Sequence, residues 1–132
     1  MSFRDSRVVA WEKKLQDVFN EIDAQMEEQY GDRYPLHPSR PPSGSTANPS
    51  ADGLFDLGAA FSAGFGSVHG RGYIISIRVA TLARVPADVM EKIEQEVLEQ
   101  LQEKLPQAFP CRDLRIERDG HSFKIVGDLS FA

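Results

Sequence analysis

The stretch GFGSVHGRGYIISIRVATL, residues 64–82, joins a glycine-rich turn to the most strand-like segment of the chain. In the second half of this stretch every other residue is apolar: Tyr73, Ile75, Ile77 and Val79. A period of two in β-branched and aromatic residues is typical of a strand with one buried face. The pattern therefore predicts a strand over 72–82, with its apolar face toward the core and Arg78 pointing the other way.

Residues 54–62 show the same alternation in a weaker form, because Gly58, Ala59 and Ala60 interrupt it. The intervening glycines permit the positive φ angles that a chain reversal needs. We therefore predict that strand 54–62 pairs antiparallel with strand 72–82 through the turn.

Two segments carry apolar residues at spacings of three and four, the period of an amphipathic helix. The first covers residues 6–30, with Gly31 placed to end it. The second covers residues 86–105, where Pro86 suits the first helical position and Pro106 is expected to stop the helix.

A hairpin is predicted for residues 113–131, because Asp119-Gly120 is a strong signal for a two-residue turn. That turn places Ile116 opposite Phe123 and gathers the apolar residues of both strands on one face.

The resulting order is α-β-β-α-β-β, which predicts a single α+β domain over residues 1–132. We expect two layers: a mainly antiparallel four-stranded sheet, with both helices on one of its faces. The sequence leaves the strand order open. Residues 54–132 supply the sheet and the second helix.

Between the first helix and the sheet, residues 31–53 are rich in proline, glycine and serine. Pro-x-x-Pro steps indicate locally extended backbone, and a long irregular segment that is ordered is usually packed on something. We expect an ordered arm that wraps its own domain or a neighbouring copy. Pro35–Arg40 also matches the Pro-x-x-Pro-x-Arg form of proline-groove ligands, although such short patterns arise often by chance.

The composition, with 41% hydrophobic and 27% charged residues, is ordinary for a globular chain. No apolar run approaches the ~20 residues that a membrane span needs, and no apolar segment of the secretion-signal kind follows Met1. Cys111 is the one cysteine, which excludes an internal disulfide and fits a reducing compartment. We therefore expect a cytoplasmic location and no membrane attachment.

The net charge of −5 is unevenly distributed. Residues 8–30 and 86–105 each carry six acidic residues against two lysines, whereas all ten arginines lie elsewhere. Arginine suits bidentate contacts to carboxylate and phosphate. The simpler interpretation is that acidic residues suit solvated helix faces and arginines suit loops and strands.

The first candidate site is the glycine turn, where backbone amides can form an anion-binding nest and a neighbouring arginine strengthens it. Its candidate ligand-binding residues, which include one arginine from the strand, are Gly64, Gly66, His69, Gly70, Arg71 and Arg78. The turn lacks the Gly-Lys-Ser/Thr of a Walker loop, and it opens a strand where a dinucleotide fingerprint opens a helix.

The second candidate is the sheet face opposite the helices, which carries Arg78, Arg115, Lys124 and the apolar Ile74. An uncovered sheet face in a small domain commonly meets another subunit, so a homo-oligomer is the preferred interpretation. Nucleic acid ranks last, because the face has no stacking aromatics and both helices are acidic.

Catalysis is the alternative, with Asp56 and His69 as weak candidates for an acid and a base. His37, His69 and His121 lack metal-ligand spacing, so we expect no metal and no cofactor. A structural role is expected for Cys111, which has no visible base partner.

The sequence thus favours a small self-associating module that presents its glycine turn and arginines to an anionic ligand or a protein partner. The first alternative is an enzyme acting on a phosphorylated or carboxylated metabolite. Nucleic-acid binding through the sheet face is the second.

Overall fold

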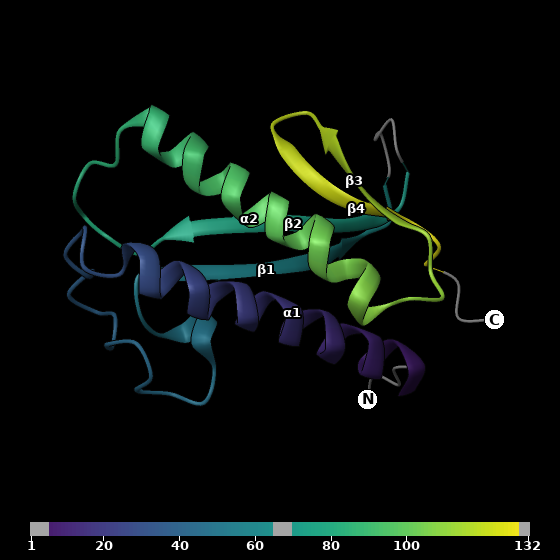
Figure 1. Ribbon diagram of the computed structural model, residues 1–132, viewed down its shortest axis with the longest axis horizontal. Helices are drawn as coiled ribbons and strands as arrows, with labels where there is room; N and C mark the ends of the chain where they lie inside the picture. The colour runs from purple at the N-terminus through teal and green to yellow at the C-terminus, as the bar shows by residue number, and fades with distance from the viewer. Residues whose placement is uncertain (1–5, 65–69, 130–132) are drawn as a thin grey trace.

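The computed structural model describes residues 6–64 and 70–129. Its elements, in chain order, are α1 (Ser6–Tyr30), the 3-10 helix η1 (Pro49–Ala51), β1 (Phe55–Ser62), β2 (Gly72–Val79), α2 (Ala87–Ala108), β3 (Leu114–Asp119) and β4 (Ser122–Gly127). Figure 1 shows α1 and α2 side by side over one face of the sheet. The predicted α+β class, with a four-stranded antiparallel sheet and two helices, is confirmed.

The strands lie in the order β1-β2-β4-β3, and every neighbouring pair is antiparallel. The predicted pairing of the first two strands is confirmed, from Phe55 opposite Val79 to Ser62 opposite Gly72. The chain crosses from β2 through α2 to the far edge at β3 and then returns, so that β4 fills the gap between β2 and β3.

The core lies between the helices and the sheet. From α1 the stripe of buried apolar side chains is Trp11, Leu15, Val18, Phe19, Ile22, Met26 and Tyr30, and from α2 it is Ile93, Val97, Leu98, Leu101 and Leu105. Trp11 joins both layers, because its ring centroid lies 4.6 Å from that of Tyr73 and 5.2 Å from that of Phe109. Neither α1 nor α2 contains an apolar run long enough to cross a membrane.

The predicted register of the last hairpin is wrong by two residues, because the turn lies one position later than predicted. The two-residue loop is Gly120-His121, so Asp119 pairs with Ser122 and Ile116 with Ile125. Gly120 has a φ of 63°, and glycine at the first loop position is what a type II′ turn requires. A type I′ turn centred on Asp119-Gly120 would instead force a positive φ on Asp119. The slip is even, so each side chain keeps its predicted face.

The ends of α2 also differ from the prediction. Pro86 is the N-cap rather than the first helical residue, and the helix continues through Pro106 to Ala108. A proline in the last turn removes only one helical hydrogen bond, and the helix closes with the Phe109 amide donating to the Leu105 carbonyl at 2.8 Å.

Strand β2 ends at Val79, three residues before its predicted end. The Ala80 amide donates to the Leu54 carbonyl at 2.6 Å, and the Ala80 carbonyl accepts from the His37 amide at 2.9 Å. These bonds draw the chain toward the arm, so Leu82 lies beyond the sheet and is 73% exposed.

The arm, residues 31–53, is fastened to its own chain beside the end of α1 and the start of β1 (Figure 1). Arg40 is its main anchor. Its Nε donates to the Gly53 carbonyl at 2.9 Å, and its Nη2 donates to the carbonyls of Ser50, Asp52 and Phe55 at 2.6, 3.0 and 2.9 Å. Because its guanidinium is occupied by these bonds, Arg40 is not available to bind a proline-groove domain as the arginine of the Pro-x-x-Pro-x-Arg pattern.

Two carboxylates complete the attachment of the arm. Glu27 of α1 accepts from the Phe55 amide at 2.9 Å, which covers a backbone donor at the start of β1. Asp52 accepts from the backbone amide and the hydroxyl of Thr46 at 3.0 and 2.8 Å. Burial opposes ionisation of Asp52, but these hydrogen bonds outweigh it and lower the pKa of the carboxyl.

We predict that Arg40→Gln lowers the free energy of unfolding by about 2–3 kcal/mol, because four carbonyls lose a charged donor. Urea denaturation measures the loss, and amide exchange in residues 41–53 should accelerate with it. The matched control is Arg84→Gln, an exposed arginine whose side chain forms no hydrogen bond or ion pair among the described residues, and which should change the free energy by less than about 0.5 kcal/mol. Equal effects of the two variants would show that Arg40 does not anchor the arm.

Candidate functional site

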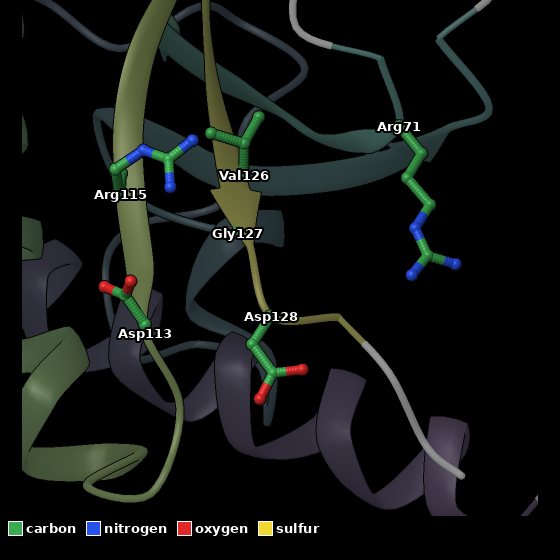
Figure 2. A pocket seen from close by; sticks show the side chains of 6 residues that line it. All are labelled: Arg71, Asp113, Arg115, Val126, Gly127 and Asp128. Atoms are coloured by element: carbon green, nitrogen blue, oxygen red, sulfur yellow. The ribbon is translucent and has the colours of Figure 1, made fainter.

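A hollow of about 500 Å³ opens where the end of β4 and the start of β3 meet the segment that leads into β2. Figure 2 shows Arg71 on one side, Arg115 on the other side of Val126, and two carboxylates in the lower part of the view. The lining residues are Arg71, Asp113, Arg115, Val126, Gly127 and Asp128. Cationic and anionic side chains from three separate segments therefore share one hollow.

Two glycines allow the backbones around the hollow to approach one another. A Cβ on Gly127, which has a φ of 122°, would lie 2.2 Å from the Asp113 carbonyl oxygen. A Cβ on Gly72 would lie 2.6 Å from both the Ile125 carbonyl oxygen and Cγ of Lys124. Real Cβ atoms do not come this close, so the sequence needs glycine at both positions for the segments to meet.

Lys124 holds Gly70 against the last hairpin. Its ammonium lies 2.8 Å from a carboxylate oxygen of Asp119 and donates to the Gly70 carbonyl at 2.9 Å. The side chain is only 2% exposed, although the register places it on the sheet face away from the helices. Lys124 therefore lies on the face that the sequence predicts, but its ammonium is buried. It instead fixes the backbone next to Arg71.

The charged side chains of the hollow differ in their existing partners. Arg115 pairs with Glu117 at 3.4 Å, and Asp128 lies 3.9 Å from the guanidinium of Arg112. Arg71 and Asp113 form no ion pair or side-chain hydrogen bond with any residue of 6–64 or 70–129, and both are exposed. One cation and one anion of the hollow are thus left for a ligand.

The remaining predicted ligand-binding residues are not all brought together. Gly64 and Gly70 touch, since a Cβ on Gly64 would lie 2.0 Å from the Gly70 carbonyl carbon. Gly66 and His69 lie outside the described residues. Arg78 is at the opposite end of β2 from Arg71, where it pairs with Asp56 at 3.9 Å. Arg71 and Arg78 therefore do not form a joint site, and the catalytic candidate Asp56 is remote from Arg71.

Sequence reasoning missed Asp113, Gly127 and Asp128 as site residues. The signal was present in the hairpin: with the turn at Gly120-His121, the register that pairs Leu114 with Gly127 also brings Asp113 opposite Asp128. The Asp128 amide donates to the Asp113 carbonyl at 2.9 Å. The misplaced turn concealed this juxtaposition.

The similarity of the chain to known proteins covers almost the whole of the fold. A family model described as an uncharacterised protein matches residues 6–127, a span that runs from the start of α1 to the end of β4. The chain belongs to this family. A relative from Borreliella burgdorferi, named only as an uncharacterized protein, is 37% identical over 122 residues, covering 92% of this chain and 95% of its own length. No solved structure matches the chain significantly.

Outside the hollow, the described residues form no metal site, and their one cysteine stands apart from it. Within residues 6–64 and 70–129, no group of three or more His, Cys, Asp or Glu side chains is arranged to hold a metal ion. Cys111 is exposed on the segment between α2 and β3. Cys111 is not among the residues that line the hollow.

Asp23 is the most perturbed of the described carboxyl groups. It is 3% exposed, and its Oδ2 has no hydrogen-bond partner. Burial raises the pKa of Asp23 to about 7, and the negative charges of Glu27 and Asp52 add to the rise, whereas Arg40 opposes it. Since the group is enclosed beneath the arm, its titration affects the fold rather than a ligand in the hollow.

We predict that Asp23 makes the protein less stable as the pH rises. The pKa is higher in the folded state than its ordinary 3.8, so the stabilisation is complete below about pH 4 and is lost as the pH rises to about 7. Asp23→Asn should remove this loss and flatten the pH dependence of the free energy of unfolding by about 2–4 kcal/mol. Denaturation at a series of pH values between 4 and 8 measures it.

The control for this series is Asp32→Asn, because Asp32 is exposed and its side chain forms no hydrogen bond or ion pair within the described part of the chain. Its pH profile should follow that of the parent protein. A parallel profile for Asp23→Asn would show that the Asp23 carboxyl ionises normally in the folded state.

Proposed function

We propose that the protein is a small cytoplasmic binding module that takes a carboxylate or phosphate group of its ligand into the hollow. The observation that carries the proposal is the guanidinium of Arg71, which borders the hollow and has no ion pair or hydrogen bond among the described residues. An arginine guanidinium presents several donors in a planar fork that matches both groups.

The surroundings of Arg71 support this role. Gly70 is held by Lys124, and Gly72 packs against β4, so the backbone on both sides of Arg71 is fixed before a ligand arrives. Preorganised donors lose less conformational entropy on binding. Arg115, across the hollow and 55% exposed in its side chain, supplies a second guanidinium whose bond to Glu117 is long.

The alternatives have weaker support. The enzyme alternative names Asp56 and His69 as its acid and base; Asp56 lies at the other end of the β1–β2 hairpin from Arg71, and His69 lies outside the described residues. Nucleic-acid binding through the sheet face would need exposed cations. On that face Lys124 is buried, and the arginines Arg78 and Arg115 each lie beside a carboxylate.

We predict that a carboxylate or phosphate ligand stabilises the parent protein and that Arg71→Ala abolishes the effect. A ligand at ten times its Kd raises the free energy of unfolding by about 1.4 kcal/mol, which a thermal-shift titration with citrate and inorganic phosphate detects. Arg78→Ala is the matched control, because Arg78 lies near the other end of β2 and does not line the hollow. If both variants lose the stabilisation equally, or if the parent protein shows none, the proposal that the hollow binds an anionic group is contradicted.

Self-association through the open sheet face is a second candidate function. Ile74 is 38% exposed on this face and lies between Ala60 and Lys124 in the register. The face also carries both signs of charge, with Arg78 and Arg115 beside Asp56 and Glu117. A surface of this kind can meet a second copy of itself across a two-fold axis, positive against negative.

We predict that light scattering at high micromolar concentration detects a dimer and that Ile74→Glu converts it to a monomer. A buried carboxylate without a partner is costly at the centre of an interface. Leu82→Glu is the control, since Leu82 is 73% exposed but lies beyond the end of β2. A monomeric parent protein would remove this candidate and leave the hollow untouched.

A further inference from the structure

We infer that the ligand of the hollow is a small zwitterion, with a cationic group held by Asp113 as well as the anionic group held by Arg71. The inference rests on the proposed function, because it concerns the same hollow. It adds the second charge of the ligand and therefore its chemical class.

The first step is the balance of charge among the lining residues. Four of them are ionised, two arginines and two aspartates. Arg115 is next to Glu117, and Asp128 is next to Arg112, so each of these charges already has a neighbour of opposite sign. What remains is one guanidinium, that of Arg71, and one carboxylate, that of Asp113.

The second step is the placement of these two groups. In Figure 2 they lie on opposite sides of the hollow, with Val126 and Gly127 between them. They are too far apart to pair with each other, since no ion pair joins them within 4 Å. A ligand that joins them needs its own two charges at the two ends of a short spacer.

The third step is rigidity. Asp113 precedes β3 and is tied to the end of β4, because its carbonyl accepts from the Asp128 amide at 2.9 Å and its backbone is in close contact with Gly127. The backbone next to Arg71 is fixed by the Lys124–Gly70 bond. The fold therefore sets the separation between the two backbone positions, which limits the spacer lengths that can join the two charges.

The fourth step concerns competing ligands. A multiply charged anion such as citrate or phosphate gains Arg71 but also lies near the carboxylates of Asp113 and Asp128, and repulsion between like charges weakens its binding relative to that of a zwitterion without abolishing it. A single carboxylate gains Arg71 but leaves Asp113 unused. A zwitterion gains both interactions, and a volume of about 500 Å³ lies in the usual range for small-molecule sites.

The experiment uses ligands matched in length and different in charge. The probes are 6-aminohexanoate, hexanoate, hexylamine and adipate, with 4-aminobutyrate and 8-aminooctanoate to vary the spacer. Binding to the full chain is followed by NMR titration, which measures weak affinities directly. We expect at least one of the zwitterions to bind about fivefold more tightly than hexanoate, as a partly exposed ion pair allows.

Two variants assign the charges. Asp113→Asn should bring the affinity for the preferred zwitterion down to that for the matched carboxylate, while Arg71→Ala should remove binding of both. Asp113→Lys should reverse the preference, so that adipate binds more tightly than 6-aminohexanoate. Asp113 is exposed, and its side chain forms no ion pair or hydrogen bond with the described residues. The amide spectra should therefore show that both Asp113 variants remain folded.

The outcomes separate the two proposals. If hexanoate binds as tightly as every zwitterion and loses affinity only in Arg71→Ala, the zwitterion is excluded and the anion-binding hollow stands. If no probe, adipate included, shows binding that depends on Arg71, both fail. If hexylamine binds as tightly as the zwitterions, the carboxylate end contributes nothing, and both are likewise overturned.

Discussion

The ion pair between the buried ammonium of Lys124 and the partly exposed carboxylate of Asp119 is the constraint on which the geometry of the hollow depends. A lysine ammonium is rarely withdrawn from water, because its desolvation cost must be offset by an opposite charge and by hydrogen-bond acceptors. Here the Asp119 carboxylate supplies the charge and the Gly70 carbonyl supplies an acceptor. One side chain of β4 thereby connects the turn of the last hairpin with the entry to β2. The hollow exists because these segments are held in contact.

A second polar centre lies at the other end of the β1–β2 hairpin and has a structural role. Arg40 binds four carbonyls, Glu27 covers a strand amide and Asp52 caps a turn within the arm. The acidic composition of the first helix is therefore only partly a solvated surface. Glu27 and Asp23 face the arm, where they share a confined space with Arg40. Arginine in this chain thus serves two purposes, attachment of irregular backbone at Arg40 and an open charge at Arg71.

Much of the fold could be predicted from local patterns. The spacing of apolar residues predicted both helices, and α1 ends at Tyr30 as predicted, because a single buried stripe extends from Trp11 to Tyr30 and Gly31 follows it. Alternation also gave the pairing of β1 with β2. The turn of the last hairpin failed by one residue, since Asp-Gly fits a type I′ turn centred on both residues and a type II′ turn that begins at the glycine.

The site was less accessible to sequence reasoning. The prediction located Arg71 but joined it with Arg78, because no pattern in the strand tells which of its ends a partner element approaches. That information resides in the strand order and register, where β4 pairs with β2 at Tyr73, Ile74 and Ile75, toward the Arg71 end of the strand. The acidic side of the hollow depends on the hairpin register, and the burial of Lys124 depends on its contacts with Gly70, Gly72 and Asp119. These are long-range contacts that periodicity does not encode.

The insertion of β4 between β2 and β3 has a consequence for how the chain is made. On the ribosome, β1, β2 and α2 emerge before residues 122–127, so the inner edge of β2 has no neighbour until nearly all of the domain has been synthesised. Contacts that are remote in sequence form slowly, because the entropy of loop closure must be overcome first. The nascent chain therefore carries an unsatisfied sheet edge from the synthesis of β2 until that of β4, and its completion depends on the last strand arriving before another chain occupies that edge.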